Sequence, residues 1–202
     1  MSVEFSTALQ NLNKIYPGYD DKVGYEIAGF VWFQGWNDVL QWPTVNEYAF
    51  NMANLIRDVR KEVETPNMPV IIGELGQGGI RPTGSGANRH RGMRIAQQSV
   101  TLLPEFRNNS LYVPTSPYVI SNASQYNGGY HYFGRADTYF HIGEAFGKGI
   151  LPLLNLRKRS PVVHLSPAHS GEGSRVPESL FSLDYVSEEE YGWDVGEEFV
   201  SE

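Results

Sequence analysis

Two short apolar runs separated by a helical pattern constrain the fold of this chain more than any other feature. Residues 25–34 (YEIAGFVWFQ) and 69–75 (PVIIGEL) are rich in branched and aromatic side chains, which is typical of strands buried on both faces in a parallel sheet. Between them, residues 44–63 place apolar side chains at three- and four-residue steps, the pattern of an amphipathic helix. This strand–helix–strand order predicts an α/β layered fold.

The ends of the middle helix carry their own signals. Thr44 and Glu47 have the spacing of a capping box, in which two side chains satisfy the free amides at a helix start. Thr65-Pro66 would end the helix, because the residue before a proline avoids the helical conformation.

The rest of the chain continues the alternation. We expect helices at residues 5–15, 89–103 and 136–151, a third strand at 110–120 broken by Pro114 and Pro117, and Gly-rich loops at 76–88 and 121–134. Gly143 and Gly147 lie four apart in the last helix, so they share one face and predict close packing on the sheet. About three parallel strands are fewer than a sheet usually has, which hints that part of the domain is missing.

The charge of the chain is concentrated near its end. The net charge is -7, yet residues 170–202 hold ten acids and one base, which leaves 13 acids and 15 bases elsewhere. Because this remainder is nearly neutral, we expect no nucleic-acid surface. Residues 155–202 lose the periodic pattern and are rich in Gly, Ser, Pro and Glu, so we predict an acidic, disordered tail after a folded domain at residues 1–154.

Several classes of site are excluded by what the sequence lacks. There is no cysteine, so disulfides and thiolate metal sites are ruled out, and no Cys/His or HExxH pattern predicts a metal. Residues 76–81 fail as a phosphate loop because Arg81 stands where the third glycine belongs. No apolar run reaches 18 residues, and the N-terminus has no signal-peptide pattern. We therefore expect no cofactor and no membrane partner, and the compartment is left open.

Polar residues follow directly after the first apolar run. Gln34, Gly35, Asn37 and Asp38 stand at the carboxyl end of the expected strand, where open α/β sheets form ligand sites. An Asn amide there can donate to an oxyanion, and Gly35 allows a substrate to approach the backbone closely. A plain turn is the alternative, since these residues are also turn formers, and the spacing alone slightly favours the turn.

His131 lies on a loop just before the last helix, a suitable place for a general base; a surface histidine among loop aromatics is the alternative. Glu74, at the end of the second apolar run, either faces the same site or is a structural acid, and the second interpretation is slightly favoured. His141, inside the last helix, is interpreted as structural, and His90 has no supporting neighbours.

Gly35-Trp36-Asn37-Asp38 is a literal G-x-N-D within GFVWFQGWND, and PVIIGELG (69–76) and GYHYFGRADTYFHIGEAFGKGIL (129–151) follow in order. Together these segments resemble the sialate O-acetylesterase-like carbohydrate esterases of the SGNH hydrolase superfamily, over about residues 5–154. The resemblance implies a flavodoxin-like three-layer α/β/α fold, an acetylated carbohydrate substrate and no cofactor. It implies that Asn37 is the oxyanion donor, that Gln34, Gly35, Asp38 and Glu74 surround the pocket, and that His131 is the base for a nucleophilic serine.

The chain departs from the family pattern at the nucleophile. The family serine lies on a loop after the first strand, well before G-x-N-D, but only 34 residues precede Gly35, and Ser2 and Ser6 lie in no Gly-rich turn. Ser85 is the best internal substitute, but it does not match G-x-S-x-G and is interpreted as part of a flexible surface loop.

The acid that should orient His131 is also absent. Position 128, three residues before His131, is glycine instead of aspartate. Asn127 or Asp137 would have to take that role.

We therefore expect an SGNH hydrolase fold truncated at its N-terminus, nearly inactive alone, whose partners are an acetylated carbohydrate and the missing N-terminal segment. A pseudoenzyme and a half that needs a partner chain are less favoured. A carbohydrate-binding protein without catalysis is the alternative from another class, with sugars stacking on the clustered aromatics: Trp32, Trp36, Trp42, Tyr130 and Tyr132. An unrelated flavodoxin-like binding protein is disfavoured, because the phosphate loop is absent.

Overall fold

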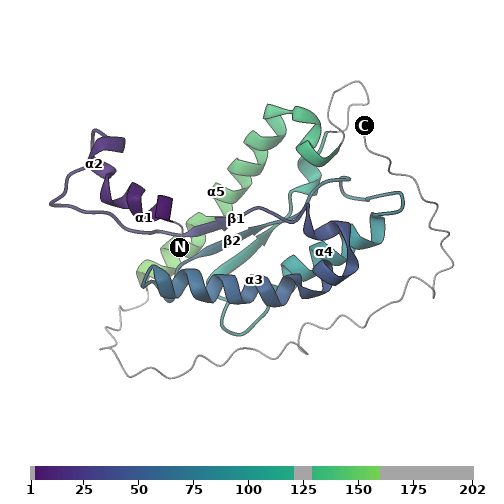
Figure 1. Ribbon diagram of the computed structural model, residues 1–202, viewed down its shortest axis with the longest axis horizontal. Helices are drawn as coiled ribbons and strands as arrows, with labels where there is room; N and C mark the ends of the chain where they lie inside the picture. Colours follow the sequence, from purple (N-terminus) through teal and green to yellow (C-terminus); the bar gives the residue numbers. More distant parts are fainter. Residues whose placement is uncertain (1–2, 121–128, 160–202) are drawn as a thin grey trace.

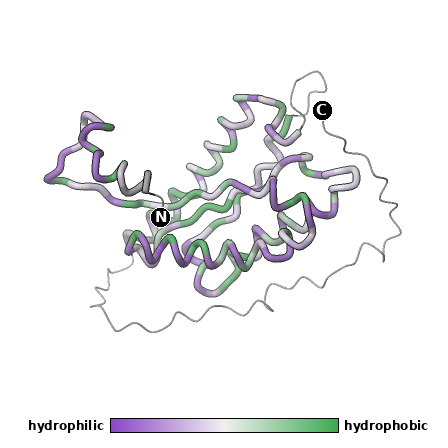
Figure 2. Tube along the Cα trace, in the orientation of Figure 1, coloured by the Kyte–Doolittle hydropathy of each residue, from purple (hydrophilic) through white to green (hydrophobic). Residues whose placement is uncertain are grey.

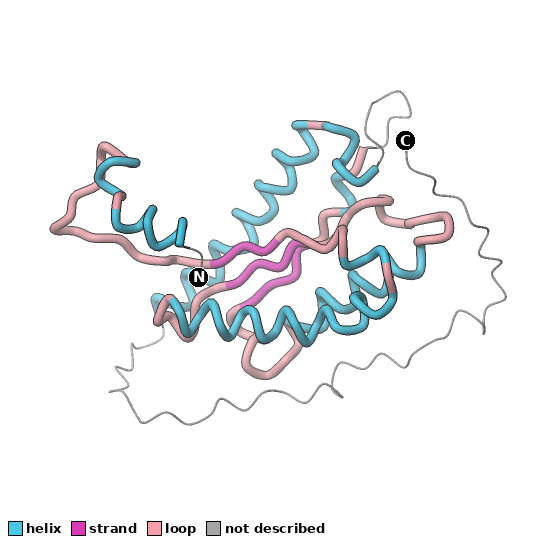
Figure 3. The backbone as a smooth tube through the Cα atoms, viewed as in Figure 1, coloured by secondary structure: helices cyan, strands magenta, loops and turns pink. Residues whose placement is uncertain are grey.

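The computed structural model describes residues 3–120 and 129–159 (Figure 1). It contains a parallel sheet in the order β1-β2-β3, made of β1 (Phe30–Trp32), β2 (Val70–Gly73) and β3 (Ser110–Val113). Phe30 pairs with Val70, and Val70 with Ser110, so the three strands lie side by side (Figure 3). The predicted α/β class with three parallel strands is confirmed.

Helices cover both faces of this sheet. Val70 and Ile72 of β2 belong to a buried cluster with α3 (Trp42–Glu62) and α4 (Ala87–Val100). Ile71 points to the opposite face, near Gly149 of α5 (Ala136–Arg159), as the alternation of side chains along a strand requires. The sheet therefore lies between α3 and α4 on one side and α5 on the other, which gives three layers (Figure 1).

Strand β1 is shorter and more exposed than the sequence predicts. Of the apolar run at 25–34, only three residues pair with β2. Hydrophobic residues line all three strands (Figure 2), but Val31 of β1 is 45% exposed. The reason is the place of β1 at the sheet edge, where β2 is its only neighbour in the described part of the chain. Phe30 and Trp32 pack against the buried cluster, so burial is one-sided.

Helix α3 begins without the predicted capping box. Gln41 is its N-cap and Pro43 lies in its first turn, where a proline costs no hydrogen bond. Thr44 instead donates from Oγ1 to the carbonyls of Asp38 (2.5 Å) and Gln41 (2.9 Å). The hydroxyl thereby fastens the 3-10 turn η1 (Asp38–Leu40) to the first turn of α3.

The remaining boundaries differ modestly from expectation. The first helix is divided into α1 (Val3–Gln10) and α2 (Leu12–Ile15), and β3 stops before Pro114, beyond which lies the 3-10 turn η2 (Ser116–Tyr118). Helix α5 continues past residue 154 to Arg159, so the predicted domain boundary falls inside it. Residues 160–202, most of the predicted tail, lie outside the described residues.

The predicted role of two α5 glycines is wrong. A Cβ added at Gly143 or Gly147 would meet nothing within 4 Å, whereas one at Gly149 would lie 3.0 Å from Leu111. Gly149 is therefore the glycine that brings α5 close to the sheet.

Candidate active site

The loop after β1 turns sharply at the carboxyl end of the sheet, where the sequence places it. Gly35 is buried with φ of +152°, and its carbonyl accepts from the Val39 amide at 3.0 Å. A Cβ on Gly35 would lie 3.3 Å from the Gln97 side chain. Both the backbone angle and the space favour glycine at this turn.

The predicted oxyanion donor lies at the surface of this loop. Asn37 is exposed and precedes η1, but its side chain makes no capping hydrogen bond. Gln34, also exposed, donates from its amide to the Asp38 carboxylate. Gln34 and Asp38, both predicted to surround the pocket, are thus paired with each other, while the side chain of Asn37 makes no capping hydrogen bond.

A buried glutamine that the sequence reasoning missed holds the base of this loop. Gln97 of α4 is 0% exposed; its Oε1 accepts from the Leu75 amide at 2.8 Å, and its Nε2 donates to the carbonyls of Gln34 (3.0 Å) and Gly73 (3.3 Å). A buried polar group needs such partners. Gln97 therefore joins the carboxyl ends of β1 and β2. The signal in the sequence is an amide at a position where the helix faces the core.

Tyr48 adds a second donor to the same place. Its hydroxyl accepts from the Trp32 indole at 3.0 Å and donates to the Gln34 carbonyl at 3.0 Å. Burial raises the pKa of Tyr48, so the hydroxyl keeps its proton. The backbone just before Gly35 is held from two helices at once.

Glu74 is engaged inside the protein. It is 4% exposed, forms an ion pair with Arg94 at 3.0 Å and accepts from the Thr115 amide at 3.2 Å. All of these contacts lie within the protein, and a place for Glu74 at the pocket stays a prediction. Arg94 also donates to the carbonyls of Leu75 (2.9 Å) and Gln77 (3.0 Å), which fixes the start of the Gly-rich loop.

His131 lies in η3 (Gly129–Gly134), a turn with unusual backbone angles. His131 is exposed, and its ring lies 4.3 Å from that of Tyr130. The next residues, Tyr132 (φ 49°) and Phe133 (φ 57°), are left-handed, which costs a non-glycine residue about 1–2 kcal/mol. Such strain persists only where the surroundings impose it, and it gathers at functional sites.

Tyr132 is the buried anchor of that turn. It is 2% exposed and packs on Phe33 (6.0 Å) and Tyr139 (5.5 Å). Its hydroxyl accepts from the Gly76 amide at 3.3 Å and donates to Gln77 Oε1 at 3.3 Å. Burial raises the pKa of Tyr132 to about 12, so the phenol stays neutral at physiological pH.

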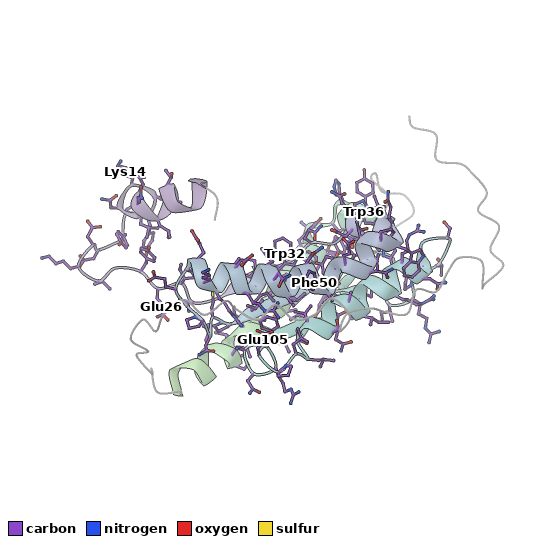
Figure 4. All side chains as sticks on the ribbon, turned by 60° about the horizontal axis from the view of Figure 1, so that its bottom comes forward. Lys14, Glu26, Trp32, Trp36, Phe50 and Glu105 are labelled. Atoms are coloured by element: carbon purple, nitrogen blue, oxygen red, sulfur yellow. The ribbon has the colours of Figure 1, made fainter. Side chains whose placement is uncertain are left out.

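The loops of Asn37 and His131 meet through the residues that precede them. Trp36 and Tyr130 have ring centroids 5.6 Å apart. Figure 4 labels Trp36 among the side chains at one end of the molecule, with Glu26 toward the other. The two predicted catalytic residues thus belong to loops in direct contact, at the carboxyl edge of β1.

His90 has a neighbour that the sequence did not reveal. Its ring packs edge-on against Trp36 at 6.0 Å, and its Nδ1 is buried without a hydrogen-bond partner among the described residues. Burial, with Arg94 and Arg89 nearby, lowers the pKa of His90. A neutral imidazole therefore supports the Trp36 side of the contact.

The other residues considered from the sequence have contacts of their own or lie outside the described residues. Asp137 is paired with Arg135 and accepts from the Thr138 amide at 2.9 Å, so its carboxylate is engaged within the first turn of α5. Asn127 and position 128 lie outside the described residues, as does Ser2. Ser85 is exposed in a turn before α4, and His141 stacks on Tyr118 at 6.1 Å.

Within the described ranges, two kinds of feature are absent: a cluster of metal-ligating side chains and a membrane-spanning helix. Residues 3–120 and 129–159 contain no group of three or more His, Asp or Glu side chains placed to hold a metal ion. Among the helices described, none has the length and apolarity to cross a membrane.

A family model for carbohydrate esterases, described as sialic acid-specific acetylesterases, matches residues 5–113. This chain belongs to that family. A probable carbohydrate esterase of Arabidopsis thaliana is 36% identical over 58 residues, which cover 29% of this chain and 22% of that protein. The crystal structure of the same Arabidopsis protein shares 20% identity with a TM-score of 0.49, covering 75% of this chain and 53% of that one.

Membership of the carbohydrate esterase family confirms the resemblance seen in the sequence. The matched range contains the Asn37 loop and Glu74 but ends at Val113 of β3, before the His131 loop. This chain spans less than two thirds of the relative's length. The role of His131 therefore stays a prediction.

Proposed function

We propose that this chain supplies the oxyanion donor and the base of a carbohydrate O-acetylesterase. Asn37 and His131 carry these roles on an acetyl ester of a sugar. The observation that supports the proposal most is the 5.6 Å contact between Trp36 and Tyr130, because it joins the loops of the two residues. Family membership supplies the reaction class.

The proposed reaction is acyl transfer through a serine. The serine oxygen attacks the acetyl carbon while His131 takes its proton, and the Asn37 amide donates to the oxyanion of the tetrahedral intermediate. The bond to the sugar oxygen breaks as His131 protonates that oxygen. Water then cleaves the acetyl-serine by the same steps, so the products are acetate and the deacetylated sugar.

The serine is proposed to come from outside the described residues. No hydrogen bond joins His131 to a serine within 3–120 and 129–159, where Ser99 donates to Ala96 and Ser110 to Phe106. If that serine lies outside residues 1–202, the chain by itself shows only the residual catalysis that binding and the oxyanion donor provide.

The decisive experiment is to read the genomic sequence upstream of Met1 and to assay any in-frame extension that carries a Gly-x-Ser block. In the extended enzyme, Asn37→Ala should lower kcat for an O-acetylated sialic acid by about 10²–10³, and His131→Ala by about 10⁴–10⁶. The exposed residues Asn51 and His141 provide matched controls as Asn51→Ala and His141→Ala. Full activity of the Asn37 and His131 variants would refute the proposal.

The unextended chain provides a second test. Its turnover of p-nitrophenyl acetate should be no faster than that of the His131→Ala variant. A turnover that His131→Ala abolishes would mean that a nucleophile lies within these 202 residues.

A sugar-binding protein without catalysis is the second candidate, favoured by the paired rings of Trp36 and Tyr130, the latter 40% exposed. It predicts sugar binding that Trp36→Ala abolishes and that Asn37→Ala and His131→Ala leave unchanged. Calorimetric titration with the deacetylated and acetylated sugar separates the two candidates.

A further inference from the structure

Gln77, on the loop after β2, contacts the His131 turn on both sides of His131. Its Nε2 donates to the carbonyl of Tyr130 at 3.1 Å, and its Oε1 accepts from the hydroxyl of Tyr132 at 3.3 Å. The side chain is 7% exposed. Both ends of one amide are thus used, one on each neighbour of the histidine.

We infer that Gln77 is a positioning residue that sets the place of the His131 imidazole at the site. The inference rests on the proposed function of His131. It adds a specific requirement, an amide at position 77, to the reaction proposed above.

The turn needs such support because its backbone is strained. Tyr132 and Phe133 are left-handed, and His131 itself is exposed, its ring in contact with Tyr130. An unsupported turn of this kind relaxes to more favourable backbone angles. A relaxed turn would carry the imidazole away from the place where Tyr130 meets Trp36.

Gln77 is suited to this role because its own backbone is fixed. Arg94 donates to the carbonyls of Gln77 (3.0 Å) and Gly79 (2.8 Å), and it is held in turn by Glu74. A line of contacts therefore runs from α4 through Arg94 and Gln77 to the His131 turn. A site group is placed well when the residues around it are themselves locked.

The chemistry of the two contacts requires an amide. The Tyr130 carbonyl needs a donor, and the Tyr132 phenol, whose pKa burial raises to about 12, acts as a donor to Oε1. A carboxylate at position 77 would satisfy the phenol but place negative charge against the carbonyl. A protonated carboxyl group, in contrast, has one donor and one acceptor like the amide.

The test uses NMR spectra of the full chain, with Gln77→Met as the main variant because methionine keeps the length and removes both contacts. We expect the His131 ring signals to move and the amide exchange of Tyr132 and Phe133 to rise at least about ten-fold. Gln98→Met, at an exposed position of α4, is the matched control, and it should leave both the His131 signals and the exchange of Tyr132 and Phe133 unchanged.

Gln77→Glu provides the second variant. At pH 7 the turn signals should differ from those of the wild type, and near pH 4, where a glutamate begins to protonate, they should return toward the wild-type signals at the same pH. Unchanged His131 signals and exchange in Gln77→Met, or no recovery in Gln77→Glu, would overturn the inference. These spectra do not depend on esterase activity, so a failure of the proposed function appears separately in the His131→Ala assay.

Discussion

The Asn37 loop and the His131 turn lie in contact at one edge of the sheet, yet different interactions hold them. The first is continuous with β1 and η1, and the buried Gln97 ties the backbone at its base, at Gln34, to Gly73 and Leu75 at the end of β2. The second keeps a left-handed backbone and depends on Tyr132 and Gln77. The comparison teaches that the first loop is part of the core, whereas the second is an attachment to it.

This difference has an energetic consequence. A substitution that removes the Gln97 hydrogen bonds leaves buried backbone groups without partners, which lowers the stability of the whole domain. A substitution of Tyr132 or Gln77 removes contacts of the His131 turn, but it also allows the strained backbone to relax. The first kind of change should therefore show in global unfolding, and the second mainly in local order.

The largest effect is expected for Gln97→Met. It leaves the Leu75 amide and the Gly73 carbonyl without this partner, while the Gln34 carbonyl keeps the Tyr48 hydroxyl. At about 1–3 kcal/mol for each of the two buried groups, the free energy of unfolding should fall by about 2–5 kcal/mol. Urea unfolding measures it. The exposed neighbour, as Gln98→Met, is the control. A loss below about 1 kcal/mol would mean that the Asn37 loop is not part of the core.

Alkaline pH should lower the free energy of unfolding through the buried Tyr132 of the His131 turn. Burial raises the pKa of Tyr132 from the ordinary value of 10.0 to about 12, so this tyrosine's contribution is complete below pH 10 and is lost as the pH rises from 10 to 12. Two pKa units correspond to about 3 kcal/mol.

The measurement is urea unfolding at pH 9 and pH 11.5. In Tyr132→Phe the difference between the two pH values should shrink by about 2 kcal/mol. Tyr16→Phe, at an exposed tyrosine away from this turn, is the control and should leave the difference unchanged. Equal pH dependence in the wild type and Tyr132→Phe would show that the phenol is not buried in the native state.

The smallest effect is expected for Gly134→Ala. Gly134 ends the left-handed turn with φ of +66°, and a Cβ there would meet nothing within 4 Å, so the cost is that of the backbone angle alone, about 1 kcal/mol. Thermal unfolding gives the stability, and amide exchange should rise in residues 130–133 but not in 34–38. A rise in both segments would abolish the distinction between the two loops.

The sequence predicted the features that depend on local pattern. Alternating apolar runs and helical spacing gave the three strands and the helices between them, and the G-x-N-D string marked the loop that leaves β1. These features follow from side chains within a few residues of one another. For the same reason the capping box at Thr44 was misplaced, because Pro43 moved the helix start by one turn.

The supports of the site were beyond such reasoning. Gln97 reaches Gln34 across 63 positions and Gln77 reaches Tyr130 across 53. Gln97 stands where its helix faces the core, but no local pattern shows which distant backbone groups either glutamine will bond. The exposure of Val31 escaped prediction too, since an apolar run does not reveal how many neighbours its strand will have. The catalytic residues stay predictions for a related reason: their roles depend on where a third group, the serine, is placed.

The bond from Thr44 to the Asp38 carbonyl bears on the thermodynamics of ligand binding. It couples the turn after Asn37 to a helix of 21 residues, so the conformational entropy of that turn is lost when the chain folds. A ligand that accepts from the Asn37 amide then meets a backbone already in place, and little further ordering opposes its association. In Thr44→Val this hydroxyl contact is lost, so the turn after Asn37 would become ordered only when the ligand binds. The entropy of binding would then be less favourable.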